Sequence, residues 1–193
     1  MSAGAGIGLA GSHRTGKSTL ARVVAKRSGI PFIKTTTTEV FARLGLDPAA
    51  KMDFATRLNV QRHILRVYQE AWQSAHLAHQ SFITDRTPVD LLAYTFADIQ
   101  GDTKVNDEEL ELYVADCFAV TNRFFKSLVL VQPGIPLIYA AGKAALNKAY
   151  IEHINTLIIG FCHDARLAVS VHVLPREMTD LETRIEAIRT MPG

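Results

Sequence analysis

The sequence predicts an α/β fold in which a parallel sheet is covered by helices on both faces. Two observations carry this prediction: short apolar runs alternate with longer segments of helical periodicity, and the apolar runs are continuous. Continuous apolar runs are typical of parallel strands that are buried on both faces. The 193 residues suit one domain, and neither an internal repeat nor a linker divides the chain.

Five apolar runs are the expected strands, and turn signals or helical patterns separate them. In chain order, the strands are expected at 6–10, 31–35, 81–84, 127–131 and 167–174. The helices are expected at 16–27, 39–44, 52–80, 88–99, from 106 onward, at 144–163 and at 178–189. Gly29 and Gly45 suit the ends of the first two helices, Pro88 suits a first helical turn, and Asn106 suits a cap before three acidic residues.

Apolar residues spaced three or four apart identify the core faces of these helices. In the first helix they are Leu20, Val23 and Val24. The stripe of the long helix at 52–80 includes Trp72, which we expect in the core, with packing beside a bound base as the alternative.

The composition excludes several classes of protein. Hydrophobic residues make up 48% of the chain, which is too many for a disordered chain, and no apolar run approaches the roughly 20 residues that span a bilayer. With no such run, no membrane partner is expected. Two cysteines, Cys117 and Cys162, cannot form a disulfide framework, so a reducing cytoplasm is expected. The net charge of +2 neither indicates nor excludes a nucleic-acid partner.

A phosphate-binding loop is the strongest motif in the chain. Residues 11–18 match G-x-x-x-x-G-K-[ST], and the match lies between an expected strand and an expected helix. In such a loop the main-chain N–H groups face inward, the lysine reaches the β- and γ-phosphates, and the serine binds Mg²⁺. We therefore expect the nucleotide to be bound by Gly11, Ser12, His13, Arg14, Thr15, Gly16, Lys17, Ser18 and Thr19.

An acidic residue that serves the magnesium is expected at the end of the third strand. Asp85 follows this strand and is itself followed by Arg86, whereas the fourth strand runs into Gln132. Asp85 and Arg86 would emerge at the carboxyl edge of the sheet, where ligands bind in open α/β folds, or would form a structural ion pair there. Asp85 would either hold Mg²⁺ or act as general base, and Glu39, which follows the second strand, is the rival base.

With these two motifs, residues 6–100 resemble the phosphate-loop (P-loop) kinases of small molecules and nucleotides. The resemblance implies a three-layer fold with a five-stranded sheet of order 2-3-1-4-5. It also implies ATP and Mg²⁺, and transfer of the γ-phosphoryl group to an acceptor. Residues 1–193 would form one kinase domain, with substrate-binding and lid segments at about 36–80 and 134–150, and residues 174–175 would flank the adenine.

The loop itself is similar to the Asp-Arg-Thr-Gly-Lys-Thr-Thr form of eukaryotic-type thymidylate kinases. In that family the loop arginine stabilises the transferring phosphoryl group and the lid lacks arginines. Here Arg14 takes that position, and the expected lid at 142–150 contains Lys143 and Lys148 but no arginine. His13 departs from the family, whose acid at this position contacts the sugar of the substrate.

The segments 35–41, 43–48 and 84–94 resemble phage-encoded nucleotide-kinase-like proteins. Some of these phosphorylate the hydroxymethyl group of 5-hydroxymethyluracil in DNA, a step in thymidine hypermodification, which implies DNA modification by a phage protein in the host cytoplasm. A free deoxynucleoside monophosphate kinase and a nicotinamide-riboside-type kinase are alternatives within the class. Outside it, a nucleotide-hydrolysing switch and a regulator without turnover are the alternatives.

Acceptor binding is expected after the second strand and at the start of the long helix. Arg57 and Gln61 lie four apart and share one helix face, so they would meet a phosphate and a base edge unless that face is merely solvated. The remaining expected acceptor-binding residues are Thr35, Thr38 and Lys143. A DNA acceptor would require a flipped base, with the DNA backbone near Arg57, Arg62, Arg66 and Arg123. A homodimer is left open.

Overall fold

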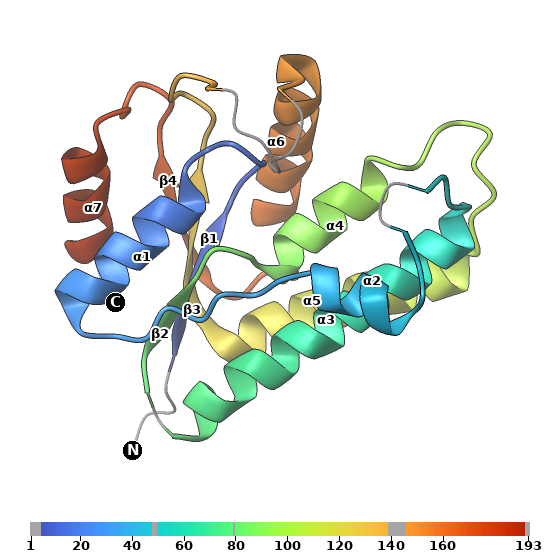
Figure 1. Ribbon diagram of the computed structural model, residues 1–193, viewed down its shortest axis with the longest axis horizontal. Helices are drawn as coiled ribbons and strands as arrows, with labels where there is room; N and C mark the ends of the chain where they lie inside the picture. Colours follow the sequence, from blue (N-terminus) through green and yellow to red (C-terminus); the bar gives the residue numbers. More distant parts are fainter. Residues whose placement is uncertain (1–4, 48–49, 79, 139–145, 192–193) are drawn as a thin grey trace.

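Within residues 5–47, 50–78, 80–138 and 146–191, which the computed structural model describes, four parallel strands form one sheet (Figure 1). The strands are β1 (Gly6–Ala10), β2 (Phe82–Thr84), β3 (Phe125–Val131) and β4 (Ser170–Leu174), in the order β2-β1-β3-β4. The helices are α1 (Lys17–Ser28), α2 (Thr38–Arg43), α3 (Phe54–Leu77), α4 (Pro88–Phe96), α5 (Asp107–Phe124), α6 (Lys148–Cys162) and α7 (Leu181–Arg189).

The expected five-stranded sheet of order 2-3-1-4-5 is wrong, because residues 31–35 do not form a strand. This segment makes a single bridge, between Phe32 and Ile83 of β2, with hydrogen bonds from the Ile33 amide to the Ile83 carbonyl and from the Ile83 amide to the Pro31 carbonyl. Pro31 has no N–H to donate, and β2 is only three residues long, so no longer ladder can form.

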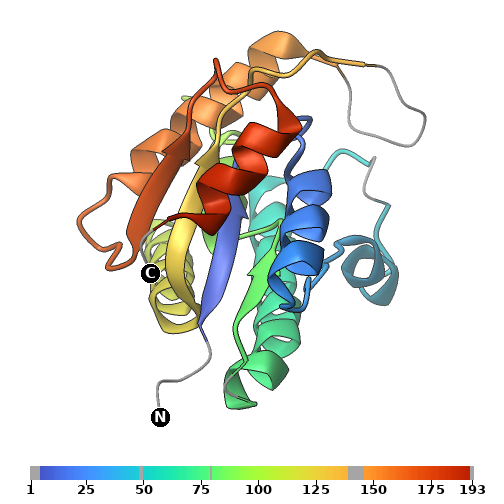
Figure 2. The ribbon, with the colours of Figure 1, turned by 90° about the vertical axis from the view of Figure 1, so that its left-hand side faces the viewer.

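Helices cover both faces of the sheet (Figure 2). The buried apolar residues of the described part of the chain form two clusters, one on each face. On one face α1 and α7 pack together over a core that includes Leu9, Leu20 and Ile185. On the other face α3, α4, α5 and α6 enclose a larger core. Leu9 and Ala10 are neighbours in β1, are fully buried and belong to different cores, which is why the strand is apolar at successive positions.

The helix ends follow their capping residues. Asn106 caps α5 by accepting a hydrogen bond from the Glu109 amide, as expected. The helix α3 begins later than the expected residue 52 because Asp53 caps it, and α6 begins at Lys148 because Asn147 caps it. The expected start of that helix at residue 144 lies outside the described residues. In the described part of the chain, no helix combines the length and the apolar character that crossing a membrane requires.

Trp72 is a core residue, as the sequence predicts. Its side chain is fully buried on α3, with ring centroids 4.9 Å from Phe125, 5.7 Å from Tyr68 and 6.0 Å from Phe124. The indole therefore packs α3 against the end of α5 and the start of β3.

Replacing this side chain should destabilise the protein strongly. We expect Trp72→Ala to lower the free energy of unfolding by about 3–5 kcal/mol, because the lost contacts leave a cavity between two helices and the sheet. Leu77→Ala is the matched control on the same helix, since Leu77 is 68% exposed. Urea unfolding of both variants tests this, and equal midpoints would contradict the expectation.

Candidate functional site

The loop between β1 and α1 adopts a conformation that requires its two glycines. At Gly11 an added Cβ would lie 2.5 Å from the Val131 carbonyl oxygen, and at Gly16, the N-cap of α1, φ is +87°. Arg14 also has a positive φ, of +66°, which is uncommon for a residue with a side chain. The chain therefore curls tightly just before the helix.

The curled loop presents main-chain donors at a helix N-terminus. Among the described residues, no acceptor takes a hydrogen bond from the amides of Gly16, Lys17 or Ser18. Unpaired N–H groups at a helix start, together with the positive end of the helix dipole, form a binding site for anions. The backbone thus presents main-chain donors in the arrangement that the motif predicts, and we call this part of the loop the cradle.

Lys17 is buried within this cradle. Only 6% of its surface is exposed, and Nζ donates hydrogen bonds to the carbonyl oxygens of Gly11 and, at 2.8 Å, of Ser12. Burial lowers the pKa of Lys17 to about 8, with Asp90 and Asp85 opposing the shift and Arg86 adding to it. A phosphate that entered the loop would supply the negative charge this ammonium lacks.

Ser18 and Asp85 lie together, as the two motifs predict. The Ser18 hydroxyl donates a hydrogen bond to Oδ2 of Asp85, which is buried at the end of β2. The other carboxylate oxygen, Oδ1, and the Thr84 hydroxyl are buried without a partner among the described residues. These oxygens fit Mg²⁺, which binds through one or two protein ligands together with phosphate oxygens and water.

Asp90 connects the loop to α4. Its carboxylate is 1% exposed and accepts hydrogen bonds from the amide of Gly11 at 2.9 Å and from the amide and hydroxyl of Thr87 at 2.8 and 2.7 Å. Thr87 and Asp90 thereby form a capping box at the start of α4. Asp90 was not among the expected site residues, although the pattern Thr-x-x-acid before an apolar run is the signal for such a cap.

Two cavities meet beside the loop. The loop cavity, of about 400 Å³, is lined by residues 13–19, 85–86 and 135–138. The helix cavity, of about 430 Å³, lies among α3, α4 and the start of α6, and its lining includes Gln61, Tyr68, Tyr94 and Tyr150. His13 and Arg86 line both cavities, so the two spaces join at these side chains.

Hydrogen bonds and charges hold the junction in place. The Tyr94 hydroxyl accepts a hydrogen bond from the His13 amide and lies 3.0 Å from Nδ1 of the same residue. Burial raises the pKa of Tyr94 to about 12. Burial alone would lower the pKa of Arg86, but Tyr68, Asp90, Tyr94 and Asp85 together raise it. Among the described residues, Asp85 and Arg86 do not form an ion pair with each other, so the alternative of a structural ion pair between them is wrong.

Arg57 and Gln61 line the helix cavity, so their helix face is not merely solvated. Arg57 forms an ion pair with Asp98 at 3.1 Å, and Oε1 of Gln61 is buried without a partner among the described residues. Thr37 lines this cavity, whereas Thr35 and Thr38 do not. Lys143 and the side chain of Glu39 lie outside the described residues.

The other expected basic residues are distributed over different surfaces. Arg62, Arg66 and Arg123 line a groove between α3 and α5 and do not reach the helix cavity, because they stand on another face of the helices. Arg14 lines the loop cavity, and its Nη1 lies 3.5 Å from the Ile138 carbonyl oxygen. Arg14 and Lys148 also line a side cavity of about 570 Å³ next to Arg176 and Glu152.

Comparisons with known proteins agree with this fold. The model of a family described as AAA domain matches residues 7–126, and a search of curated proteins finds no match. Among solved structures, deoxyadenosine kinase from M. mycoides is 18% identical with a TM-score of 0.65, and 95% of this chain covers 96% of that one. Thymidylate kinase from Ehrlichia chaffeensis is 12% identical with a TM-score of 0.63, over 97% of this chain and 98% of that one. The NadR protein, solved with NR, is 14% identical with a TM-score of 0.68, over 96% of this chain and 49% of that one.

The protonation of Lys17 should govern nucleotide binding at alkaline pH. Because its pKa in the free protein is about 8, the ammonium is present below that pH and is lost above it. Binding of ATP would then require uptake of a proton, so the affinity should fall by up to about tenfold per pH unit above pH 8. Isothermal titration from pH 7 to 10 measures this.

Two lysine variants distinguish the source of that pH dependence. Lys26→Met, on the exposed side of α1, should keep the decline, and Lys17→Met should bind weakly with no decline in this range. An affinity of the unmodified protein that stays level up to pH 10 would contradict the assignment.

Proposed function

Since the chain belongs to the AAA domain family, we propose that it is an ATP-dependent kinase that transfers the γ-phosphoryl group to a nucleotide-type acceptor. The meeting of the two cavities at His13 and Arg86 is the observation that carries this proposal. A kinase must bring a nucleoside triphosphate and an acceptor together, and phosphoryl transfer depends mainly on such positioning and on neutralised charge. The named kinases with the same fold support the proposal as an analogy.

The loop residues have separate roles in this proposal. The amides at the start of α1 and the Lys17 ammonium would bind the β- and γ-phosphates, and Arg14 would face the transferring group from the rim of the loop cavity. Ser18 and Asp85 would hold Mg²⁺, which neutralises charge on the β- and γ-phosphates when bound. The adenine would enter the side cavity, which adjoins the loop cavity at Arg14 and residues 135–137.

The acceptor would bind in the helix cavity, with its hydroxyl oxygen directed at the γ-phosphorus. That oxygen forms the new P–O bond as the bond to the β-phosphate oxygen breaks, and ADP leaves. The hydroxyl proton passes to a carboxylate, and Glu39 of α2 is one candidate, as its place after residues 31–35 in the sequence predicts. Asp85 is the rival base, and its hydrogen bond to Ser18 favours the metal role instead.

The charges of the helix cavity favour an acceptor that carries no phosphate at this site. Its described lining contains two arginines, Arg57 and Arg86, and two aspartates, Asp90 and Asp98. Arg57 is paired with Asp98, so its guanidinium could bind a phosphate only by breaking that ion pair. We therefore propose a hydroxyl acceptor, namely the hydroxymethyl group of 5-hydroxymethyl-deoxyuridine in DNA, over a free deoxynucleoside monophosphate.

The position after β3 argues against a nucleotide-hydrolysing switch. Such a protein would place an acid at the end of this strand, whereas β3 ends at Val131 and is followed by Gln132 and Pro133. One kinase domain over residues 1–193, with substrate-binding and lid segments at about 36–80 and 134–150, completes the proposal. A homodimer, a phage origin and a location in the host cytoplasm stay predictions.

Labelling of three classes of acceptor tests the proposed reaction. With γ-labelled ATP and Mg²⁺, we expect label in DNA that contains 5-hydroxymethyluracil and none in ordinary DNA. A panel of free deoxynucleoside monophosphates is the third class, and label confined to it would reject the hydroxyl acceptor while keeping the kinase. Lys17→Ala should lower the transfer about 100-fold or more, because a donor to the transferring phosphates is lost. Label in DNA should also decline with rising salt, as binding to a phosphate backbone does.

Gln61 should determine the affinity for the acceptor base. We expect Gln61→Leu to raise the KM for the acceptor about tenfold, because a hydrogen bond to a base edge is lost. The melting temperature should stay level or rise, since the variant removes a buried oxygen that has no described partner. Gln80→Leu is the control, because Gln80 is exposed just after α3 and lines neither the helix cavity nor the α3–α5 groove. A melting temperature that falls with KM unchanged would show a merely structural role.

A further inference from the structure

A buried arginine lies behind the phosphate loop. Arg184 of α7 is 3% exposed, and its Nη1 donates a hydrogen bond of 3.0 Å to the Thr15 carbonyl oxygen. Its Nε donates to the carbonyl oxygen of Met178, just before α7. The remaining nitrogen, Nη2, is buried without a partner among the described residues. The guanidinium therefore bonds only to main-chain oxygens in the described part of the chain.

This arrangement is unfavourable for the free protein. No carboxylate of the described residues forms an ion pair with Arg184, and burial lowers its pKa. A buried cation without an opposite charge loses hydration that carbonyl oxygens replace only in part. Stability alone therefore does not explain why an arginine stands here.

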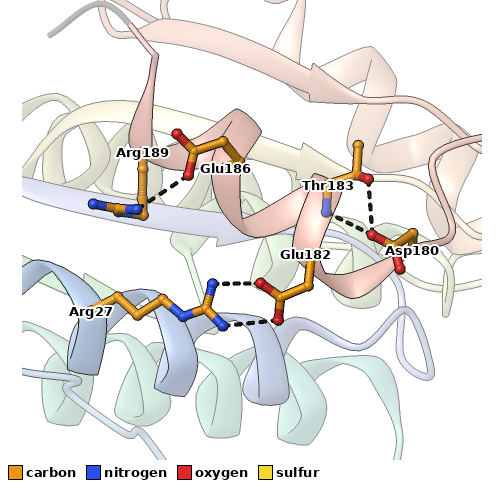
Figure 3. A network of polar contacts seen from close by, with 6 residues as sticks. All are labelled: Arg27, Asp180, Glu182, Thr183, Glu186 and Arg189. Atoms are coloured by element: carbon orange, nitrogen blue, oxygen red, sulfur yellow. Dashed lines mark hydrogen bonds and ion pairs between the residues drawn. The ribbon is translucent and has the colours of Figure 1, made fainter.

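Contacts other than those of Arg184 also attach α7 to the rest of the molecule. Asp180 caps this helix by accepting hydrogen bonds from the amide and hydroxyl of Thr183 (Figure 3). On the solvent side, both carboxylate oxygens of Glu182 accept hydrogen bonds from Arg27 of α1, at 2.6 and 2.8 Å (Figure 3). Ile185 and Ile188 are buried in the core beneath the helix. These contacts fix the position of α7, and the helix in turn fixes the position of Arg184.

Arg184 contacts the peptide between Thr15 and Gly16, whose N–H group is one of the unpaired donors at the start of α1. The C=O of Thr15 and the N–H of Gly16 belong to one planar trans peptide, so they point in opposite directions. The loop cavity is lined by Thr15, Gly16 and Lys17, while Arg184 is buried and contacts the loop from behind. A hydrogen bond that draws the carbonyl toward Arg184 therefore turns the Gly16 N–H toward the cavity.

Without such a contact this peptide would be free to rotate. Gly16 has φ of +87°, and a glycine adopts several backbone conformations at similar energy. We propose that Arg184 is a positioning residue that holds the Thr15–Gly16 peptide with its N–H directed at a bound polyphosphate. Its charge acts in the same direction, because Nη1 lies 3.8 Å from the point that a Cβ of Gly16 would occupy.

The ligand class follows from the atoms involved. An oriented N–H group and a nearby positive charge recognise phosphate oxygens and make no use of a nucleobase. The inference rests on the proposed function only in that the loop binds a polyphosphate chain. Inorganic tripolyphosphate is therefore the appropriate probe, because it separates phosphate binding from base binding and from phosphoryl transfer.

Titration of variants with tripolyphosphate tests this role. Arg184→Met removes both the charge and the hydrogen bond to Thr15, and we expect its affinity to fall by about tenfold or more. Arg184→Lys keeps the positive charge but lacks the planar guanidinium with its several N–H donors. Its affinity for tripolyphosphate should therefore lie between those of Arg184→Met and the unmodified protein. Arg27→Met is the matched control, because it breaks the exposed contact between α1 and α7 and leaves the Thr15 contact intact. Its affinity should stay unchanged.

The Gly16 amide provides a readout that a purely structural role would not move. In the unmodified protein, its NMR resonance should shift on addition of tripolyphosphate, and in Arg184→Lys that shift should shrink while the other core resonances stay in place. If Arg184→Met does not fold, Arg184→Lys and this amide decide the question.

Arg184 variants that bind tripolyphosphate with full affinity and show the full Gly16 shift would overturn the inference, as would an unmodified protein that binds none. Tripolyphosphate binding without any phosphoryl transfer would reject the proposed kinase and leave the role of Arg184 intact.

Discussion

The hydrogen bond from the Gly11 amide to the buried carboxylate of Asp90 sets the geometry of the whole site. It joins the end of β1 to the start of α4, two segments 79 residues apart. The same carboxylate closes the capping box with Thr87, so it positions the helix as well as the loop. Because α4 also supplies Leu91 and Tyr94 to the helix cavity, one side chain determines how the two cavities face each other.

The two cavities differ in electrostatic character, and this difference distinguishes their ligands. Around the loop, the cations of Lys17 and Arg184 are buried and bond to main-chain carbonyl oxygens. Neither cation forms an ion pair with a carboxylate of the described residues, and a phosphate ligand would supply such a partner. In the helix cavity, Arg57 already has a partner in Asp98, and the described lining has equal numbers of arginines and aspartates. A polyanion suits the first cavity, and a ligand without net charge suits the second.

How much of this could be predicted depends on whether a feature is local. The phosphate loop follows from eight consecutive residues, and the contact between Ser18 and Asp85 follows because adjacent parallel strands end at one edge of the sheet. The role of Arg184 was not predictable, since it depends on how α7 packs against a loop 169 residues earlier. The expected strand at 31–35 was wrong because strand formation depends on the length of the neighbouring β2 and on the missing N–H of Pro31.

The positions of the basic residues constrain how DNA would reach the helix cavity. A flipped base enters a pocket only if its flanking phosphates lie against the surface around the mouth. Arg57 stands inside the cavity and is paired, whereas Arg62, Arg66 and Arg123 lie in the groove between α3 and α5. Arg62 is drawn toward Glu109, with Nη2 2.7 Å from its carbonyl oxygen, while Arg66 forms no ion pair among the described residues. A DNA strand that reached both the groove and the helix cavity would therefore have to cross α3. Its phosphate backbone would contact the outer face of α3, while the flipped base would contact Gln61 on the inner face. A free nucleoside would need no such path. The arginines of the groove would therefore contribute to the binding of a DNA acceptor and not to that of a free nucleoside, whereas the helix cavity would bind the base of either.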